Sequence, residues 1–378
     1  MKVVVFADLH LGVTTYGELD PSTGLNTRVL NALASLDALV KYVLDNDIKI
    51  VAFVGDAYKN ALPSRTLSYE FDKRVKALSD ANVRLLLLDG NHDVSRMAQT
   101  KSPTAHLGHL ALPNVTHTRF YQVENVTLGQ ETVRFVFLPT YHTAEEIEAY
   151  VAQTATDYPV VFLFHGTLQG SLLNDWNVAD RETYVDPEVF DQPGVAAVAM
   201  GHLHKPQVIN TKPLIFYTGS LQRVDFSEEH QLKGFVILTV NPDATATREF
   251  HEIPSQSFVT LSHQVTSSVD ATTDVLNYVQ QQVIPPDAVV RLHVDLPDRT
   301  QVLDDRLIQT TLYSMGASYV LDLKRRYPVI SRVRIDALNG GLSEADALRL
   351  YFKEHKLAKQ RIARGLRLID ELQGEGLL

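Results

Sequence analysis

Short runs of branched apolar residues recur along the first 256 residues, and near the N-terminus they alternate with segments of helical periodicity. Residues 2–7, 48–56 and 84–93 are apolar runs of the kind found in strands that a sheet buries on both faces. Between them, residues 28–45 place apolar side chains three or four positions apart, and a second helical segment follows Pro63. The pattern therefore predicts strands that alternate with helices.

From residue 133 onward the apolar runs are joined by shorter connections. Five further strands are predicted, at 133–139, 159–166, 195–204, 213–220 and 234–240. An apolar strand must be covered on both faces, so two sheets packed together with helices outside them satisfy this pattern. We therefore predict an α/β fold in which a two-sheet β-sandwich is flanked by helices.

A different pattern begins after residue 256. Strands are predicted at 257–267, 288–296 and 318–324, with helices at 269–282 and 301–315 between them. Gly340 and Gly341 interrupt the chain, and a helical pattern resumes over residues 343–373. The expected parts are the sandwich domain at 1–256, a small α/β capping domain at 257–338 and a C-terminal helical segment at 339–378.

The composition is that of an ordinary globular protein. The 378 residues are 45% hydrophobic and 21% charged, and no apolar run approaches the ~20 residues that a membrane span needs. Cysteine is absent, which excludes a disulfide framework and a thiolate metal site. We expect a cytoplasmic protein without a membrane segment, although a chain without cysteine is also compatible with export.

The net charge of -10 argues at first against a nucleic-acid partner. The charge is unevenly distributed, because residues 301–378 contain 13 Lys and Arg but only 10 Asp and Glu. A small basic cluster lies there, at Lys324, Arg325, Arg326, Arg332 and Arg334. Metal ions bound by the acidic front part would offset some of its carboxylates. The cluster is read either as a solvated surface or as a nucleic-acid contact.

Five short polar motifs directly follow apolar strands. They are Asp8-Leu9-His10, Gly55-Asp56, Gly90-Asn91-His92-Asp93, His165-Gly166 and Gly201-His202-Leu203-His204. Ligand sites of open α/β sheets collect at the carboxyl ends of the strands. Each motif alone could be a capped turn, but five of them in this order indicate one functional site.

The donor atoms of these motifs are carboxylate oxygens and imidazole nitrogens, without sulfur. Such a set favours Mn, Fe, Zn or Mg. On an extended segment, residues two apart point to one side, so Asp8 would pair with His10 and His202 with His204. A pair of ions needs a bridging carboxylate, for which Asp56 is the candidate.

The order of the motifs resembles that of the calcineurin-like metallophosphoesterase superfamily. Within it, the chain is similar to the nuclease subunits of SbcCD-type complexes, through DLHLG at 8–12 and GSLQRVDFSEEHQLKGF at 219–235. The superfamily motifs span residues 8–204, and the narrower similarity continues more loosely over nearly the whole chain. No chemical need for the run at 219–235 follows from its residues.

The resemblance implies two ligand sets that share one carboxylate: Asp8, His10, Asp56 and His204 for one ion, and Asp56, Asn91, His165 and His202 for the other. His92 would contact the scissile phosphate or donate a proton to the leaving oxygen. Asp93 would orient His92 by a hydrogen bond, or would cap the turn. Lys59 stands where some relatives have a histidine, so it is either a phosphate contact or simply exposed.

The resemblance also implies a function and partners. The expected activity is that of a DNA nuclease with two divalent ions, most simply Mn²⁺, acting 3′ to 5′ on duplex ends and endonucleolytically on single strands, in DNA double-strand-break repair or recombination. Expected partners are DNA, an SbcC-like SMC-type ATPase bound by the C-terminal helices, and a second copy of the chain in a homodimer. The alternatives are a phosphoesterase of the same fold with a non-DNA substrate, and a binding subunit that has lost catalysis.

Overall fold

The computed structural model describes residues 1–94, 101–108, 112, 114–154, 157–173, 176–177, 184–266, 270–328, 364–365 and 367–368. Met1–Arg326 form one compact unit, and Tyr327–Leu378 form a second. The predicted boundary after residue 256 falls inside the first unit. The predicted C-terminal helical segment at 339–378 lies almost wholly outside the described residues.

The first sheet contains six strands in the order β16-β15-β1-β2-β3-β4. Its strands are β1 (Lys2–Phe6), β2 (Ile50–Val54), β3 (Arg84–Leu88), β4 (Val115–Thr118), β15 (Gly234–Val240) and β16 (Ala246–Glu252). Strands β1 to β4 run parallel, whereas β15 is antiparallel to β1. The chain therefore returns to this sheet only after it has built the second one.

The second sheet also contains six strands, in the order β13-β14-β12-β7-β6-β5. Its strands are β5 (Gln122–Leu128), β6 (Glu131–Leu138), β7 (Val160–His165), β12 (Val195–Gly201), β13 (Gln207–Thr211) and β14 (Leu214–Tyr217). The four central strands are parallel. Four short strands lie between β7 and β12 in the chain and form two pairs. They are β8 (Thr167–Leu168) with β11 (Tyr184–Val185), and β9 (Leu172–Leu173) with β10 (Trp176–Asn177).

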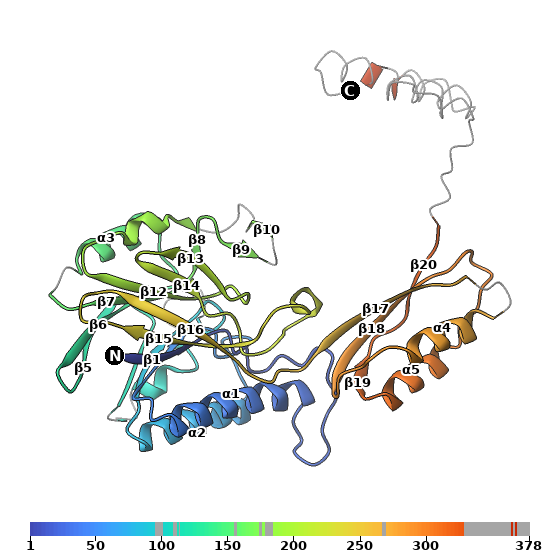
Figure 1. The fold of residues 1–378 in the computed structure, drawn as a ribbon, viewed down its shortest axis with the longest axis horizontal. Coiled ribbons are helices and arrows are strands. Elements are labelled where there is room, and N and C mark those ends of the chain that lie inside the picture. Colours follow the sequence, from blue (N-terminus) through green and yellow to red (C-terminus); the bar gives the residue numbers. More distant parts are fainter. Residues whose placement is uncertain are drawn as a thin grey trace. The chain divides into compact units, whose positions relative to one another are not determined.

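The layers follow from the alternation of side chains along buried strands. In β1, Val3 and Val5 face the second sheet, whereas Val4 and Phe6 face the helices. Helices α1 (Thr27–Asp45) and α2 (Arg65–Asp80) cover the outer face of the first sheet, and α3 (Ala144–Ala152) with the 3₁₀ turn η2 (Pro187–Phe190) covers that of the second (Figure 1). The predicted helix-flanked two-sheet sandwich is confirmed.

Local capping residues set where the helices begin. The side chains of Asn26 and Ser64 accept backbone hydrogen bonds at the starts of α1 and α2. Helix α3 begins with a reciprocal capping box between Thr143 and Glu146. The sequence patterns had not predicted α3. Within the described part of the chain, no helix combines the length and hydropathy that crossing a membrane requires.

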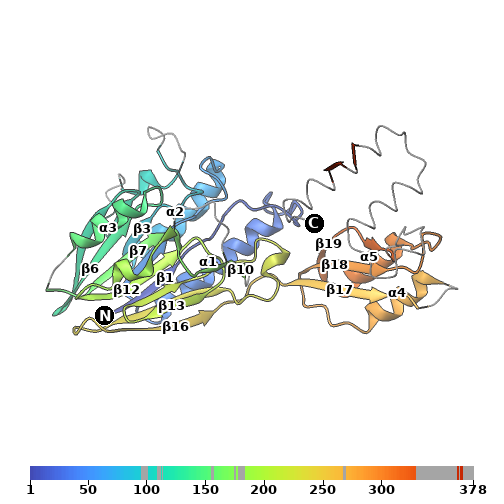
Figure 2. The same ribbon diagram turned by 90° about the horizontal axis from the view of Figure 1, so that it is seen from above.

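Residues 258–326 form the small α/β part of the first unit (Figure 2). Its parallel sheet has the order β17-β18-β19, and β20 also pairs with β18. The elements are β17 (Phe258–Gln264), α4 (Ala271–Gln280), β18 (Ala288–Asp295), α5 (Asp305–Ser314), β19 (Ala317–Val320) and β20 (Lys324–Arg326). The single strand predicted at 318–324 was wrong, because the chain leaves the sheet after Val320 and rejoins it at Lys324.

Candidate metal centre

The five motifs meet at one edge of the sandwich. Strands β1, β2 and β3 of the first sheet and β7 and β12 of the second end beside one another, and each is followed directly by a motif. Neighbouring parallel strands present their carboxyl ends at the same edge. Contacts of Asp56 with His165 and of Asn91 with His202 bring the motifs of the two sheets together across the sandwich.

The backbone at these strand ends is not extended. Asp8, His10, Asp56 and His202 all have positive φ, at 54°, 47°, 61° and 95°. The prediction that Asp8 with His10, and His202 with His204, lie on extended segments was therefore wrong, because the left-handed conformation turns the chain sharply after each strand. Hydrogen bonds of 3.0 Å, from Asp8 N to Gly55 O and from His10 N to Asp56 O, hold these turns together.

One donor group consists of Asp8, His10 and His204. Their ligand atoms lie within 4.8 Å of one another, and the Nε2 atoms of His10 and His204 are 2.9 Å apart. Asp8 and His10 are almost fully buried. Two imidazole nitrogens that face each other beside a carboxylate are arranged as they would be around a shared cation.

A second donor group surrounds Asn91. Its Oδ1 lies 3.0 Å from His165 Nε2 and 3.0 Å from His202 Nδ1. Asp56 lies between the two groups, with Oδ2 at 3.6 Å from His10 Nε2 and 3.4 Å from His165 Nε2. The other oxygen of Asp56 accepts a hydrogen bond from the His92 backbone N–H at 2.8 Å. Asp56 therefore offers one free oxygen to both groups.

The closely packed carboxylates and imidazoles of the site shift one another's pKa values, and Asp56 raises the pKa of His165 to about 9 although burial alone would lower it. Burial raises the pKa of Asp8, whereas the Asp56 carboxyl, although burial alone would raise its pKa, is held well below its usual range by His165. Burial and the neighbouring His204 lower the pKa of His10, which favours the neutral ring that binds metals. The described residues thus place two buried carboxylates among imidazoles and an amide, a donor set that suits a divalent metal.

Glycines let the backbone approach this close. A Cβ on Gly90 would lie 2.1 Å from Asp56 Oδ1, and one on Gly55 would lie 2.3 Å from His165 Nδ1. Neither contact is sterically allowed. The glycines of the motifs therefore leave room for the donor side chains themselves.

Comparison with known proteins identifies the family. A family model for calcineurin-like phosphoesterases matches residues 1–206, more than half of the chain. The chain belongs to the calcineurin-like phosphoesterases. Enzymes of this family hydrolyse phosphate esters and bind divalent metals, in agreement with the Asp and His groups of the site.

Three relatives of this phosphoesterase carry nuclease or repair names. Identity is 24% over 269 residues to the SbcD subunit of the SbcCD nuclease of Staphylococcus saprophyticus, 26% over 281 residues to the SbcD subunit of the same nuclease of Bacillus subtilis, and 24% over 274 residues to DNA double-strand break repair protein Mre11 of Methanopyrus kandleri. The alignments cover 64%, 65% and 67% of this chain, and 66%, 68% and 57% of the relatives.

His92 and Asp93, the last two residues of the third motif, contact different parts of the site. His92 lies edge-on to His10, and its Nδ1 donates to the Lys59 carbonyl at 2.9 Å. The fully buried Asp93 carboxylate accepts from the backbone N–H groups of Ala57, Tyr58 and Gly90 at 3.0–3.1 Å. Of the two roles predicted for Asp93, the structure shows the turn cap and not the hydrogen bond to His92, because the carboxylate points inward to the backbone. The Lys59 side chain is exposed.

Two residues that the sequence did not single out support the site. His204 donates through Nδ1 to Glu228 Oε1 at 2.7 Å, and Lys233 lies 2.5 Å from the other oxygen of Glu228. Both belong to the run at 219–235. In the sequence, only the F-x-E…KGF pattern of that run marked these two residues, and the pattern alone did not indicate a chemical role for them.

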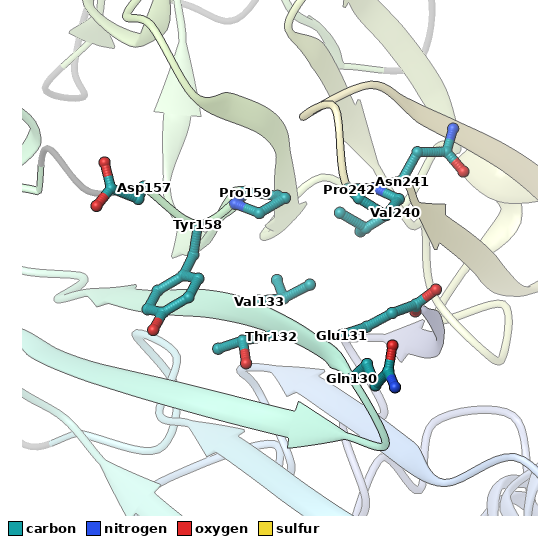
Figure 3. A pocket seen from close by; sticks show the side chains of 10 residues that line it. All are labelled: Gln130, Glu131, Thr132, Val133, Asp157, Tyr158, Pro159, Val240, Asn241 and Pro242. Atoms are coloured by element: carbon teal, nitrogen blue, oxygen red, sulfur yellow. The ribbon is translucent and has the colours of Figure 1, made fainter.

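Two further candidates lie away from the donor groups. His142 packs against Tyr150 and belongs to none of the donor groups found among the described residues. A pocket of about 220 Å³ is lined by residues 130–133, 157–159 and 240–242 (Figure 3). It lies where β6 and β7 begin, so it is at the opposite edge of the second sheet from the motifs.

Proposed function

We propose that this phosphoesterase is a DNA nuclease with two divalent metal ions, most simply Mn²⁺, which acts 3′ to 5′ on duplex ends and endonucleolytically on single strands. One observation carries the proposal: seven donor side chains from both sheets converge, with Asp56 between two groups. Asp8, His10 and His204 would hold one ion, Asn91, His165 and His202 would hold the other, and Asp56 would contact both.

Ions bound there would polarise the phosphodiester and activate the attacking water. The chain's own contribution is the placement of the donors and of His92. Because Nδ1 of His92 donates to the Lys59 carbonyl, the ring is fixed and Nε2 is left for the substrate. In the proposed reaction the protonated His92 donates from Nε2 to the leaving oxygen. Asp93 positions the backbone of this turn and has no direct part.

Two observations favour DNA over a small phosphate ester. The relatives are named as nucleases or as a break-repair protein. In addition, the small α/β part carries Arg291, His293, Lys324 and Arg326 on one face of its sheet, at positions set by the β17-β18-β20 register, together with Asp295, which pairs with Arg326. Helix α4 covers the other face, where His263 stacks on Tyr278. Basic side chains on an open sheet face suit contacts with a phosphate backbone.

The proposal extends to partners. We propose an SMC-type ATPase bound by the helical segment at 339–378, and a homodimer formed through α2 rather than α1. Helix α1 buries nine residues on its own sheet, whereas the outer side of α2 exposes Tyr69 at 65% beside a groove that also includes Leu107 and Leu112. Light scattering at micromolar concentration tests the dimer, and a monomeric mass would exclude it.

Incubation of the purified protein with end-labelled duplex and single-stranded DNA tests the proposed function. Cleavage with Mn²⁺ that chelator abolishes is expected, with labelled products that shorten from the 3′ end of the duplex. Hydrolysis of a nitrophenyl phosphodiester without any cleavage of DNA would instead support the alternative, a phosphoesterase with another substrate.

A further inference from the structure

We propose that Glu228 is a positioning residue for His204, and that the buried Lys233 holds Glu228 in place. The inference rests on the proposed function, because it assigns His204 to one of the two ion sites. It gives a role to the run at 219–235, for which the motifs offered none.

Hydrogen bonds to both oxygens of the Glu228 carboxylate hold it against His204. It ends the 3₁₀ turn η3 (Phe226–Glu228), and its side chain is only 5% exposed. Oε1 accepts from His204 Nδ1 at 2.7 Å, while Oε2 accepts from the Val224 backbone N–H at 3.3 Å. Because a carboxylate oxygen accepts, this contact favours a proton on His204 Nδ1 and turns Nε2 toward the ion site, where it faces His10 Nε2 at 2.9 Å.

The side chain of Lys233 also contacts the main chain of His204. Its ammonium group is fully buried, and its three N–H groups face four acceptors: Glu228 Oε2 at 2.5 Å, Ser220 Oγ at 2.8 Å, Gln231 Oε1 at 3.1 Å and the His204 carbonyl at 3.2 Å. A buried Lys–Glu pair is a poor source of stability compared with apolar residues of similar size. Its contacts with both the ring partner and the carbonyl of His204 point to a role in placing that residue.

The turn that carries Glu228 is anchored on its other side. Phe226 packs edge-on against Tyr16 and Phe258, and the Thr260 N–H donates to Glu229 at 2.6 Å. Neighbouring residues of one short turn therefore contact the small α/β part and the ion site. Such double anchoring restricts the movement of the Glu228 carboxylate.

The expected effect is specific to one ion. His165, in the other donor group, donates from Nδ1 to the Val54 carbonyl at 2.7 Å, so its orientation does not depend on Glu228. Loss of an outer hydrogen-bond partner of a ligating histidine lowers metal affinity by roughly 10- to 100-fold. Only the ion held by Asp8, His10 and His204 should lose affinity when Glu228 is changed.

Mn²⁺ titration of the full chain tests the inference with four variants. Glu228→Gln should weaken one of two ions by roughly 10- to 100-fold, whereas the control Glu148→Gln, at an exposed position of α3, should bind both as the wild type does. Lys233→Met leaves Glu228 buried without its cation and should lower thermal stability. The double variant Glu228→Gln/Lys233→Met should recover thermal stability but not Mn²⁺ affinity. If the pair had a purely structural role, the double variant would recover both.

Nuclear magnetic resonance of ¹⁵N-histidine-labelled, metal-free protein gives a second readout. His204 should carry its proton on Nδ1 in the wild type and lose this preference in Glu228→Gln. Wild-type affinity in Glu228→Gln, or affinity restored by the double variant, would overturn the inference. Wild-type protein that binds no pair of ions would defeat the proposed function instead. The histidine spectra would still decide whether Glu228 fixes the His204 ring.

Discussion

Gly90→Ala is expected to damage the site through one methyl group. The added Cβ would lie 2.1 Å from Asp56 Oδ1 and 2.4 Å from the Asp56 backbone nitrogen, whereas real Cβ atoms essentially never come closer than 3.0 Å. The backbone on both sides is tied by the Asp93 carboxylate, which binds Gly90 N–H and Ala57 N–H. Because the added Cβ meets both the carboxylate and the backbone nitrogen of Asp56, the whole residue must shift.

The required displacement of Asp56 is about 1 Å, and a misplacement of that size costs on the order of 10²-fold in rate. Overpacking should also lower the free energy of unfolding by about 1–3 kcal/mol. The assay is hydrolysis of a nitrophenyl phosphodiester at saturating Mn²⁺, with thermal unfolding measured in parallel.

Gly108→Ala is the matched control. A Cβ there would meet its nearest neighbour, His117 Cβ, at 3.7 Å, which is an ordinary contact. This variant should retain the turnover of the wild type. If Gly90→Ala also turned over within about twofold of the wild type, the claim that the glycine makes room for the Asp56 carboxylate would be refuted.

Two further predictions concern single side chains. His92→Gln should still bind two ions but cleave on the order of 10²–10⁴-fold more slowly; a variant that has lost its ions when checked by metal analysis would contradict the assignment of proton donor. Arg28→Met should destabilise the chain by about 3 kcal/mol in chemical denaturation, because the buried Arg28 donates to Gln256 and to the Arg223 carbonyl. The exposed Arg65→Met is its control, and equal effects of the two would count against this reading.

The sequence predicted the layers well because strands buried on both faces are continuous apolar runs. Strands β1, β2 and β7 are buried along almost their whole length, and all three were predicted. Strands at the sheet edges were missed. In β5 and β16 the positions are exposed or half-buried, with the single exception of Val126 in β5, so neither gives an apolar run. Helix α3 was missed because it is short, although Thr143 and Glu146 form a recognisable capping pair.

The structure brings the predicted donor residues close together, but the sequence did not predict the geometry of the backbone that carries them. A motif shows that Asp8 and His202 follow strands, but a positive φ at both depends on the turns that the two sheets impose together. Glu228 was missed for a related reason. It reaches His204 from 24 residues away in the chain, and only the folded run at 219–235 brings the two together.

Electron paramagnetic resonance of the Mn²⁺-loaded protein tests the central claim most directly, because it reports whether two ions share one site. The account predicts two ions per chain with a spin-coupled signal, as expected for a separation of about 3.5–4 Å, and loss of that coupling in Asp56→Ala. Two magnetically independent ions in the wild type, or unchanged coupling in Asp56→Ala, would contradict it.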